Sequence, residues 1–508
     1  MNKMGQIFAD YFSDNMVLPA NKEIRFGGTV KPYTKVLLSL EKVTIETSAD
    51  SRGEWSIEFP AHAASKKAIS IIGKSGGFSQ IINNVHFGRV FLFAGQSNIE
   101  FKLEDEQHFE NEKKIYQNDS VYFFNVPQIE FFDKRRNKKR PTDLKKGQWL
   151  LATRDNIGGM SAIAFYASKV LARDYEGPIG IVDCYKGGTS ASCWLPLNLL
   201  KESKVLNDHF IKPFEDAILN KTKADFDQED LNYEKKVKNH QNSLLEYQKK
   251  YPEKTLNEVK DVVGHTPWPP PMRPESYLRP GGLFETMILQ IKYGTFNNVV
   301  WYQGENDTEN ADYYEELLSN LINTWRELFR DKSLPFLLIQ LPGYEDGIDN
   351  TWAKIRQVQL RATMKIPYVK LCSISDLGES HNIHPTDKKT PGIRIGNILQ
   401  ENQYAETPGI TKMCYEANRL TIIVSHALTL SFKNNTQFVV KTKGNKVESL
   451  FSANNFAGNK IEIDLPQGAA SVEYGFINFP NLGIFNEFGL PLSPFRIVIE
   501  KEKARLSK

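Results

Sequence analysis

Val90-Phe-Leu-Phe-Ala-Gly-Gln-Ser-Asn98 is the segment from which the architecture of this 508-residue chain follows. Five apolar residues in a row, Val90 to Ala94, are typical of a strand buried on both faces, as in a parallel sheet. Gly95 then allows a tight backbone turn, and Ser97 follows it. The segment therefore predicts a buried parallel strand that runs into a turn of functional interest.

Strands alternate with helices on the C-terminal side of this segment. Continuous apolar runs predict further buried strands, and apolar residues at helical spacing predict the helices between them. The strands are Pro178–Asp183, Asn298–Tyr302 and Phe336–Gln340, and the helices are Ser161–Ala172, Thr286–Tyr293 and Asp312–Phe329. This alternation favours an α/β domain with a doubly wound parallel sheet and helices on both faces. Ligands on such sheets bind at the carboxyl ends of the strands.

Short alternating strands flank this region. Lys35–Leu40 and Trp55–Phe59 predict an all-β, sandwich-like domain near the N-terminus. Arg419–Val424, Leu428–Phe432 and Gln437–Thr442 predict a second one near the C-terminus. We therefore expect an N-terminal β domain at residues 1–88, an α/β domain at 89–405 and a C-terminal β domain at 406–508.

Residues 201–280 interrupt the alternation. Asn232–Lys254 is rich in Lys, Glu, Gln and Asn, and Pro267-Trp-Pro-Pro-Pro271 follows it. This composition indicates a helical insertion with a proline-rich connection that lies over the α/β domain. We expect a solvated decoration; a lid and a contact between two copies of the chain are the alternatives.

Composition argues against several classes of function. A net charge of +3 gives no field that selects nucleic acid. The four cysteines form neither a dense disulfide framework nor a CxxC zinc motif. No apolar run approaches the roughly 20 residues of a membrane span, so we expect no membrane partner. Met1–Ala20 lacks the apolar core of a signal peptide, which predicts a cytoplasmic protein, or a secreted one if a signal has been removed. The oligomeric state stays open, a homodimer included.

Ser97 is the first candidate for a catalytic residue. A tight turn after a strand can project its hydroxyl at the sheet edge and leave backbone N–H groups facing an oxyanion. The segment is not the Gly-x-Ser-x-Gly elbow of α/β-hydrolases, because Ile99 replaces the second glycine. Taken alone, a serine at this place fits a helix cap equally well.

A nucleophilic serine needs a base, and one segment that contains two of the nine histidines is a candidate to supply it. Gly378-Glu-Ser-His-Asn-Ile-His-Pro385 lies late in the α/β region, where a loop can bring an imidazole to a serine on another strand. We choose His384, whose loop is restrained by Pro385, as the general base. His381 is the local alternative, and a structural hydrogen bond is the ordinary role of a lone histidine.

Two further glycine-bearing turns follow predicted strands, Lys186-Gly-Gly-Thr189 and Gln303-Gly-Glu-Asn-Asp307. Acyl transfer from an ester requires hydrogen-bond donors aimed at the tetrahedral oxyanion. The candidate donors are the backbone N–H groups of Ser97 and Gly188 and the side-chain amides of Gln303 and Asn306.

In chain order these blocks resemble the SGNH hydrolase superfamily, and more closely its sialate O-acetylesterase branch, the SASA-type carbohydrate acetylesterases. The blocks are Gly95-Gln-Ser-Asn98, Gly187-Gly-Thr189 with Trp194, Trp301-Tyr-Gln-Gly-Glu305, and Ile383-His-Pro385 with Lys388. The chain ends resemble the family's terminal β domains through Asp14-Asn-Met-Val-Leu18 with Gly27-Gly-Thr29, and through Asn486–Phe495. The resemblance covers nearly the whole chain except residues 201–280.

This resemblance implies an SGNH-type sheet between two β domains, and a serine carboxylic-ester hydrolase that removes acetyl groups from O-acetylated sugars. Sialic acids are the first expectation. Ser97 would attack the acetyl carbonyl, His384 would take its proton and return it to the sugar alkoxide, and water would clear the acetyl-enzyme. Neither a metal nor an organic cofactor is implied. The residues expected to bind substrate are Gln96, Asn98, Trp194 and Glu305.

One departure concerns the acid that orients the histidine. Many SGNH enzymes place an Asp two or three residues before the histidine, where this chain has Asn382 and His381. The candidate acids are Asp376 and Glu379, with Asp387 after the histidine as a third. A backbone carbonyl that holds the imidazole of a Ser–His dyad is the remaining option.

Two alternatives to a sialate O-acetylesterase stay open. An acetylxylan esterase or other polysaccharide acetylesterase shares the reaction, because the motifs specify the chemistry better than the sugar. The missing Asp also allows a carbohydrate-binding protein of this fold with impaired catalysis.

Overall fold

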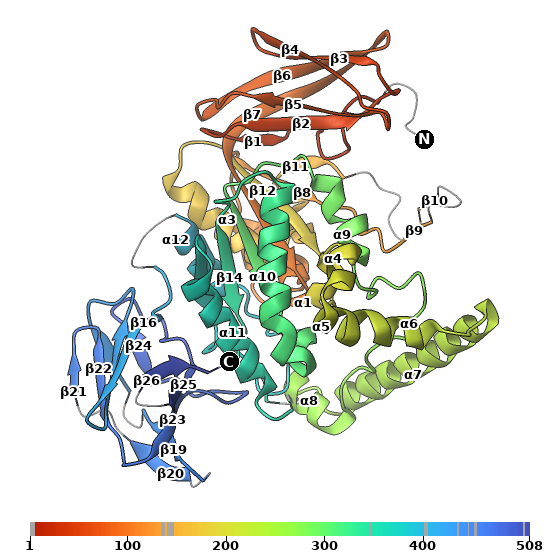
Figure 1. Cartoon of the computed structure of the whole chain (residues 1–508). Coiled ribbons are helices and arrows are strands. Elements are labelled where there is room, and N and C mark those ends of the chain that lie inside the picture. Colours follow the sequence, from red (N-terminus) through yellow and green to blue (C-terminus); the bar gives the residue numbers. More distant parts are fainter. Residues whose placement is uncertain are drawn as a thin grey trace.

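Figure 1 shows the computed structural model, in which a mixed α/β region lies between two all-β regions. The N-terminal β region is at the top of this view and the C-terminal one is at the lower left. The structure describes residues 6–133, 138–139, 147–345, 348–400, 405–433, 436–444, 447–451, 455–500 and 503–507.

The central sheet has the strand order β11-β8-β12-β7-β13-β14-β15. Neighbours from β8 to β15 run parallel, whereas β11 at the edge pairs antiparallel with β8. The expected parallel sheet is therefore corrected to a mixed one, since an edge strand with one partner can run in either direction. The strands are β7 (Phe78–Gly95), β8 (Val121–Asn125), β11 (Trp149–Leu151), β12 (Ile179–Tyr185), β13 (Asn298–Tyr302), β14 (Phe336–Gln340) and β15 (Val369–Ser373).

β7 belongs to two regions at once. Its first part pairs antiparallel with β6 as far as Phe87, and its second part pairs parallel with β12 from Arg89 onward. The expected boundary between residues 88 and 89 falls inside this continuous strand, whose hydrogen bonds join the N-terminal β region to the central sheet. The other N-terminal strands are β1 (Val17–Pro19), β2 (Ile24–Thr29), β3 (Lys35–Leu40), β4 (Val43–Ser48), β5 (Glu54–Phe59) and β6 (Ser65–Ser75).

Two helix pairs accompany the sheet, α3 packed against α12 and α10 packed against α11. Their bounds are α3 (Ala162–Asp174), α10 (Ala311–Leu328), α11 (Thr351–Lys365) and α12 (Lys389–Leu399). α10 buries Leu317, Leu321 and Trp325, which recur on one face of the helix. The expected helix at Thr286–Tyr293 is wrong. The chain forms α9 (Gly282–Thr286) and then a 3-10 turn at Ile288–Ile291, because Met287 departs from helical geometry.

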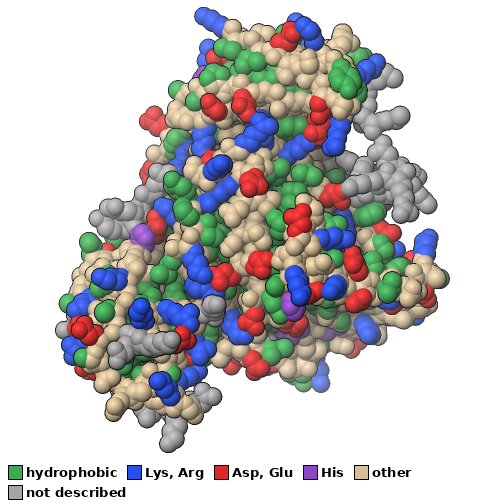
Figure 2. All heavy atoms as spheres, viewed as in Figure 1, with side chains coloured by type: hydrophobic (Ala, Val, Ile, Leu, Met, Phe, Trp, Pro, Cys, Tyr) green, Lys and Arg blue, Asp and Glu red, His purple; other side chains and the backbone are tan. Residues whose placement is uncertain are grey.

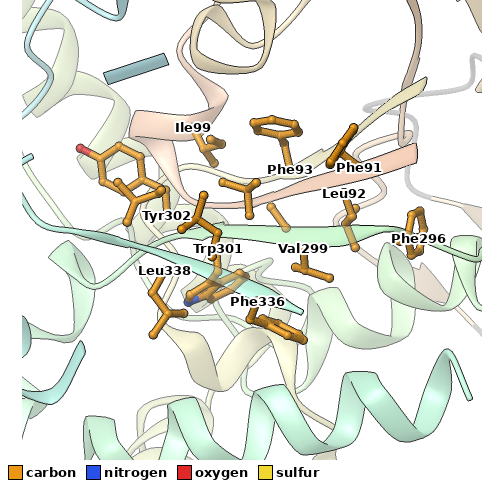
Figure 3. Packing of buried hydrophobic residues seen from close by; sticks show 14 of the residues in the cluster. Phe91, Leu92, Phe93, Ile99, Phe296, Val299, Trp301, Tyr302, Phe336 and Leu338 are labelled. Atoms are coloured by element: carbon orange, nitrogen blue, oxygen red, sulfur yellow. The ribbon is translucent and has the colours of Figure 1, made fainter. Parts of the chain in front are cut away.

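The core of the α/β region is strongly aromatic, as Figure 3 shows. Phe91 and Phe93 of β7 and Trp301 of β13 are fully buried. Trp301 lies edge-on to Trp194 and to Trp325 of α10, with ring centroids 6.1 and 5.4 Å apart. Close packing of these large rings fixes the strands relative to the helix that covers them.

The C-terminal β region contacts α11 through β25. At this junction Gln340 Nε2 donates a hydrogen bond to Ser493 Oγ at 2.8 Å, and fully buried Arg356 donates to the carbonyls of Pro342 and Asn478. The strands are β16 (Ile410–Glu416), β17 (Arg419–Val424), β18 (Leu430–Phe432), β19 (Phe438–Thr442), β20 (Val447–Phe451), β21 (Asn455–Ala457), β22 (Lys460–Asp464), β23 (Ala469–Tyr474), β24 (Ile484–Asn486), β25 (Phe495–Glu500) and β26 (Lys503–Leu506).

The stretch from 201 to 280 contains α5 (Lys204–Leu206), α6 (Lys212–Ile218), α7 (Lys223–Lys250) and α8 (Leu256–Val263). In Figure 1 these helices lie at the lower right, with long α7 extending outward. Residues 264–273, which we call the strap, lead back from α8 without regular structure. Tyr233 Oη of α7 donates to Pro267 O at 2.9 Å, and the His240 ring nitrogen lies 2.9 Å from Gly264 O. The strap is therefore fastened to α7.

Acidic and basic side chains are interspersed over the face of the molecule shown in Figure 2, in keeping with the small net charge of +3. Within the described ranges, no helix has the length and apolar character needed to cross a membrane.

The turn after β7 provides a test of the fold. Gly95 has φ +141°, and a Cβ there would lie 2.0 Å from the carbonyl oxygen of Tyr302. We predict that Gly95→Ala lowers the free energy of unfolding by about 3 kcal/mol or more, because the clash is with the backbone of a central strand. Thermal unfolding measures this. Gly159→Ala is the control, since a Cβ on Gly159 meets nothing within 4 Å. Equal melting temperatures for the two variants would contradict the prediction.

Candidate active site

The carboxyl end of β7 presents Ser97. Gln96 N donates to Tyr302 O at 3.1 Å, which fastens the turn to neighbouring β13. Ser97 then begins the short helix α1 (Ser97–Glu100). The serine therefore lies at the sheet edge where ligands of parallel sheets bind.

His384 reaches this serine from the loop between β15 and α12. Its Nε2 lies 2.7 Å from Ser97 Oγ, which is hydrogen-bonding distance. Asn98, which follows Ser97 by one residue, anchors this loop because its Nδ2 donates to Ile383 O at 2.9 Å. The structure thus brings together the serine and the histidine that the sequence singled out.

His381 lies elsewhere. Its ring nitrogens are 3.7 Å from Asp261 and 3.9 Å from Glu345, and its side chain is 31% exposed. The contact with Ser97 Oγ is made by His384 instead.

Backbone N–H groups of two turns meet beside the serine. Among the hydrogen bonds of the described residues, none uses the N–H of Ser97 or of Gly188. A Cβ on Gly187 would lie 3.4 Å from the Cβ of Ser97, so the two turns are adjacent. These N–H groups are available to an oxyanion.

Asn306 is a further donor at this place. Its Oδ1 accepts a hydrogen bond from Trp268 Nε1 at 3.2 Å, which orients the amide. Across the part of the chain that the structure describes, Asn306 Nδ2 has no hydrogen-bond partner. It is therefore open to a ligand.

The side-chain amide of Gln303, also predicted to face an oxyanion, donates its hydrogens to other groups of the protein. Its Nε2 donates to Thr189 O at 3.1 Å and to Asp307 Oδ2 at 2.6 Å, and the side chain is fully buried. Both amide hydrogens are engaged, so the prediction for Gln303 is corrected. Asp307 also accepts from Ser190 Oγ at 2.6 Å. Together they brace the turns that carry Gly188 and Asn306.

Three residues predicted to bind substrate are buried beneath the site. Gln96, Asn98 and Trp194 are 2%, 0% and 0% exposed. Gln96 Oε1 accepts from Asn306 N at 3.2 Å, and Trp194 Nε1 donates to Thr189 Oγ1 at 3.0 Å. The prediction for Asn98 and Trp194 is corrected, because their buried polar atoms hold neighbouring turns. Gln96 uses its Oε1 in the same way, and a substrate contact of its Nε2 stays a prediction. Glu305, the fourth, lines a groove beside the site.

A buried polar network lies under the Ser97–His384 pair. Asn98 Nδ2 donates to Glu305 Oε1 at 2.7 Å, and Lys388 Nζ donates to Asn98 Oδ1 at 2.7 Å. Burial raises the pKa of Glu305 and lowers that of Lys388, since it disfavours the charged form of each. Through Asn98, the network couples the start of α1 to the histidine loop.

Trp268 is a site residue that the sequence analysis missed. A Cβ on Gly188 would lie 2.2 Å from the indole, so the ring rests directly against that glycine. From α8, Lys260 Nζ donates to Asn382 Oδ1 at 2.9 Å, beside the histidine. The expectation of a solvated decoration is therefore corrected: the insertion borders the site on two sides. The available signal was a tryptophan inside a proline-rich run.

Residues 272–404 match the family described as carbohydrate esterase, sialic acid-specific acetylesterase. This match, which covers part of the chain, supports the predicted resemblance to that family. The predicted class of enzyme, a carboxylic-ester hydrolase, is confirmed. The matched range contains Asn306, His384 and Lys388 but not Ser97, which precedes it.

The esterase is similar to known proteins over most of its length. It is 26% identical to the sialate O-acetylesterase of Mus musculus over 432 residues, which cover 77% of this chain and 72% of the relative. It is 24% identical to that of Homo sapiens, with 77% and 70% covered. The crystal structure of a carbohydrate acetylesterase from Xanthomonas citri matches with a TM-score of 0.72 at 21% identity, covering 96% of this chain and 98% of that one. This last match supports the fold.

The acids predicted to orient the histidine of the esterase are engaged elsewhere. Asp376 binds Arg394 with both oxygens, at 2.7 and 2.8 Å. Glu379 accepts from Asn382 Nδ2 at 3.0 Å and from Thr386 N at 3.2 Å. The prediction that Asp376 or Glu379 orients the imidazole is therefore corrected.

Asp387 is also occupied, because it accepts the backbone N–H groups of Lys389 and Thr390 at the start of α12. Among the described residues, no carboxylate is hydrogen-bonded to His384. In that part of the chain the pair is therefore a Ser–His pair without a carboxylate partner. No backbone carbonyl of the described ranges is hydrogen-bonded to the imidazole either, so the option of a carbonyl that holds it stays a prediction.

Burial, together with the nearby charges of Lys388 and Lys260, lowers the pKa of His384 to about 4. The imidazole is therefore neutral above about pH 5. The neutral ring is the form that accepts a proton from a serine.

Glu106, His108 and Asp387 are the described residues that could hold a metal ion, with ligand atoms within 4.8 Å of one another. Glu106 Oε2 already accepts from His108 N and from Tyr166 Oη, and Asp387 caps α12. Hydrolysis through a serine and a histidine requires no contribution from this group.

The low pKa of His384 predicts the acid side of the pH profile. Activity falls only as the pH drops through about 4, where the ring becomes protonated. Lys260→Gln keeps a donor for Asn382 but removes a positive charge, so we predict that the acid limb of kcat/KM moves upward by about one unit or less. Lys249→Gln at the exposed end of α7 is the control. A downward shift for Lys260→Gln would contradict the electrostatic cause.

Asp376 offers a second test. Because its carboxylate binds Arg394, we predict that Asp376→Asn lowers the melting temperature and leaves kcat within about threefold of wild type. Arg394→Gln, which breaks the same pair from the other side, should behave alike. A fall in kcat of about 10⁴-fold at unchanged melting temperature would restore Asp376 as the orienting acid.

Proposed function

We propose that this esterase is a carbohydrate O-acetylesterase in which Ser97 is the nucleophile and His384 is the general base. The observation that carries the proposal is the 2.7 Å contact between Ser97 Oγ and His384 Nε2 at the carboxyl end of β7. The match of residues 272–404 to the carbohydrate esterase family supports the class of substrate.

In the first half of the reaction, Ser97 Oγ attacks the acetyl carbonyl carbon while His384 Nε2 takes the hydroxyl proton. The carbonyl oxygen becomes an oxyanion and accepts hydrogen bonds from the N–H groups of Ser97 and Gly188 and from Asn306 Nδ2. The bond from the acetyl carbon to the sugar oxygen then breaks. The leaving oxygen takes the proton from His384, so a free sugar hydroxyl and an acetyl-serine result.

In the second half, a water molecule attacks the acetyl carbon while His384 takes one of its protons. The bond to Ser97 Oγ breaks, and the proton passes from the imidazole to the serine. Acetic acid leaves and ionises, and the enzyme returns to its starting form. The sequence is a net hydrolysis and balances without a redox partner.

His384 works in this proposal without a carboxylate partner. Replacing the triad acid of a serine protease lowers turnover by about 10⁴-fold, chiefly because the histidine is then held in the wrong tautomer. Here the loop is held by Asn98 through the carbonyl of Ile383 and by Asn382 Oδ1, which accepts from His384 N at 3.3 Å. We infer that these contacts fix the backbone of the loop and that the contact with Ser97 Oγ positions the ring.

The sugar has two candidates. The names of the relatives from mouse and human support O-acetylated sialic acid. Acetylated neutral glycans, such as those of xylan, are favoured by the groove beside Asn306. Its lining includes the exposed Glu309 and, among the described residues, neither lysine nor arginine.

Acetate release from a panel of esters tests the proposal. The panel contains 9-O-acetyl sialic acid, acetylated xylo-oligosaccharides and p-nitrophenyl acetate. We predict that Ser97→Ala and His384→Ala each lower kcat by about 10⁴-fold or more on every ester that the wild type cleaves, since the two residues act as a unit.

His381→Ala is the matched control and should keep wild-type kcat, because its ring lies away from Ser97. Retention of most activity by Ser97→Ala would refute the nucleophile. Failure of the wild type to cleave any ester would favour the remaining alternative, a carbohydrate-binding protein with impaired catalysis.

A further inference from the structure

A groove of about 470 Å³ opens beside the candidate active site. We call it the Trp268 groove. Its lining includes Trp268 of the strap, Phe214 of α6 and Asn306 at the end of β13. It lies between the insertion and the α/β region, and its volume is within the range of roughly 300–1,000 Å³ that is usual for small-ligand sites.

The groove begins at the groups that would meet the ester. Asn306 is shared between the groove and the proposed oxyanion site, and Trp268 Nε1 donates to Asn306 Oδ1. The same indole rests against Gly188, whose N–H is the neighbouring donor. The groove therefore starts beside the donors that would bind the carbonyl oxygen of an ester at Ser97, close enough for the rest of the substrate to contact Trp268.

The surface of the groove suits a sugar ring. The Trp268 side chain is 49% exposed although it belongs to a well-fastened segment. An exposed aromatic face can cover the C–H face of a pyranose, and nearby polar groups such as Asn306 and Glu309 can bind its hydroxyls.

Charge in the groove distinguishes neutral from acidic sugars. Among the described residues that line it, Glu309 is an exposed acidic side chain, His209 is the basic one, and neither lysine nor arginine occurs. Glu305 also lines the groove, but its carboxylate is buried and bonded to Asn98. His209 stacks on Tyr313 with ring centroids 3.7 Å apart, so its ring is held against α10. A sugar carboxylate placed here would face the like charge of Glu309 without a lysine or arginine as partner, which costs binding free energy.

The insertion holds the tryptophan in this position. Tyr233 of α7 binds the carbonyl of Pro267, directly before Trp268, and Arg273 at the end of the strap pairs with Asp230 of α7. The insertion, which lies outside the family resemblance, thus provides the aromatic wall.

We propose that the Trp268 groove is the subsite for the sugar portion of the ester, with Trp268 as its stacking surface, and that it selects neutral acetylated glycans over acetylated sialic acids. This assignment rests on the proposed esterase function and specifies its substrate class. In it, the α/β region supplies the hydrolytic pair and the insertion supplies the choice of sugar.

Kinetics with Trp268→Ala and Trp268→Phe test the stacking surface. The quantity measured is the ratio of kcat/KM on acetylated xylo-oligosaccharide to kcat/KM on p-nitrophenyl acetate. We expect Trp268→Ala to lower this ratio about tenfold or more, mainly through KM, and Trp268→Phe to recover most of it. Phe78→Ala is the matched control, because Phe78 is also 49% exposed but lies in the N-terminal part of β7. An unchanged ratio in Trp268→Ala would overturn the assignment.

The proposed preference for neutral over acidic sugars is tested by comparing kcat/KM on two esters. Wild-type enzyme should show a higher kcat/KM on the acetylated xylo-oligosaccharide than on 9-O-acetyl sialic acid. Glu309→Gln, which removes one carboxylate from the groove, should narrow that difference. A wild-type preference for the sialic acid ester would overturn the selection of neutral sugars.

A binding measurement separates failure of this subsite from failure of the proposed catalysis. Calorimetric titration of Ser97→Ala with unacetylated xylo-oligosaccharide needs no turnover. Binding that is lost in the Ser97→Ala, Trp268→Ala double variant supports the groove even if no ester is cleaved. Absence of binding in Ser97→Ala, with ester cleavage intact in wild type, would refute the groove and leave the esterase function standing.

Discussion

The pairing of β7 on both of its sides is the constraint on which the rest of the structure depends. Its second half lies between β12 and β13, and Gly95 at its end packs against the carbonyl of Tyr302 with no space for a side chain. A shift of the strand by one residue would turn Phe91 and Phe93 to the opposite faces. The register of the sheet therefore sets the position of Ser97 relative to the neighbouring strand ends. The N-terminal β region is joined to the site through the same strand.

Buried polar side chains position the turns and loops that surround Ser97 at this strand end. An unpaired polar group in such an interior is costly, so partners from other segments stabilise it. Asn98 bonds one oxygen of Glu305, Lys388 Nζ and the carbonyl of Ile383, and Gln303 and Asp307 hold the turn of Gly188. Most side chains of the conspicuous motifs thus position the reacting groups. Few are left to contact a substrate.

The insertion adds what the central sheet lacks. A strand end offers donors and a nucleophile but little surface to hold a sugar. The strap covers Gly188 with an indole on one side, and α8 places Lys260 near His384 on the other. The insertion is fastened to α10 through the stacking of His209 on Tyr313 and to the site through these two contacts. In our proposal this is where the specificity of the esterase resides.

The sequence by itself determined the elements with strong local patterns: β13 and β14 occupy the predicted Asn298–Tyr302 and Phe336–Gln340, and Ser97 and His384 meet as expected. Continuous apolar runs specify buried strands, and their carboxyl ends share one edge. Only the tertiary structure decided which atoms of these motifs remain free. Gln303 and Asn306 both carry side-chain amides. The N–H groups of Gln303 bond to Thr189 and Asp307, whereas those of Asn306 have no partner among the described residues. Trp268 was likewise beyond local inference, because its place against Gly188 depends on contacts between segments about 80 residues apart.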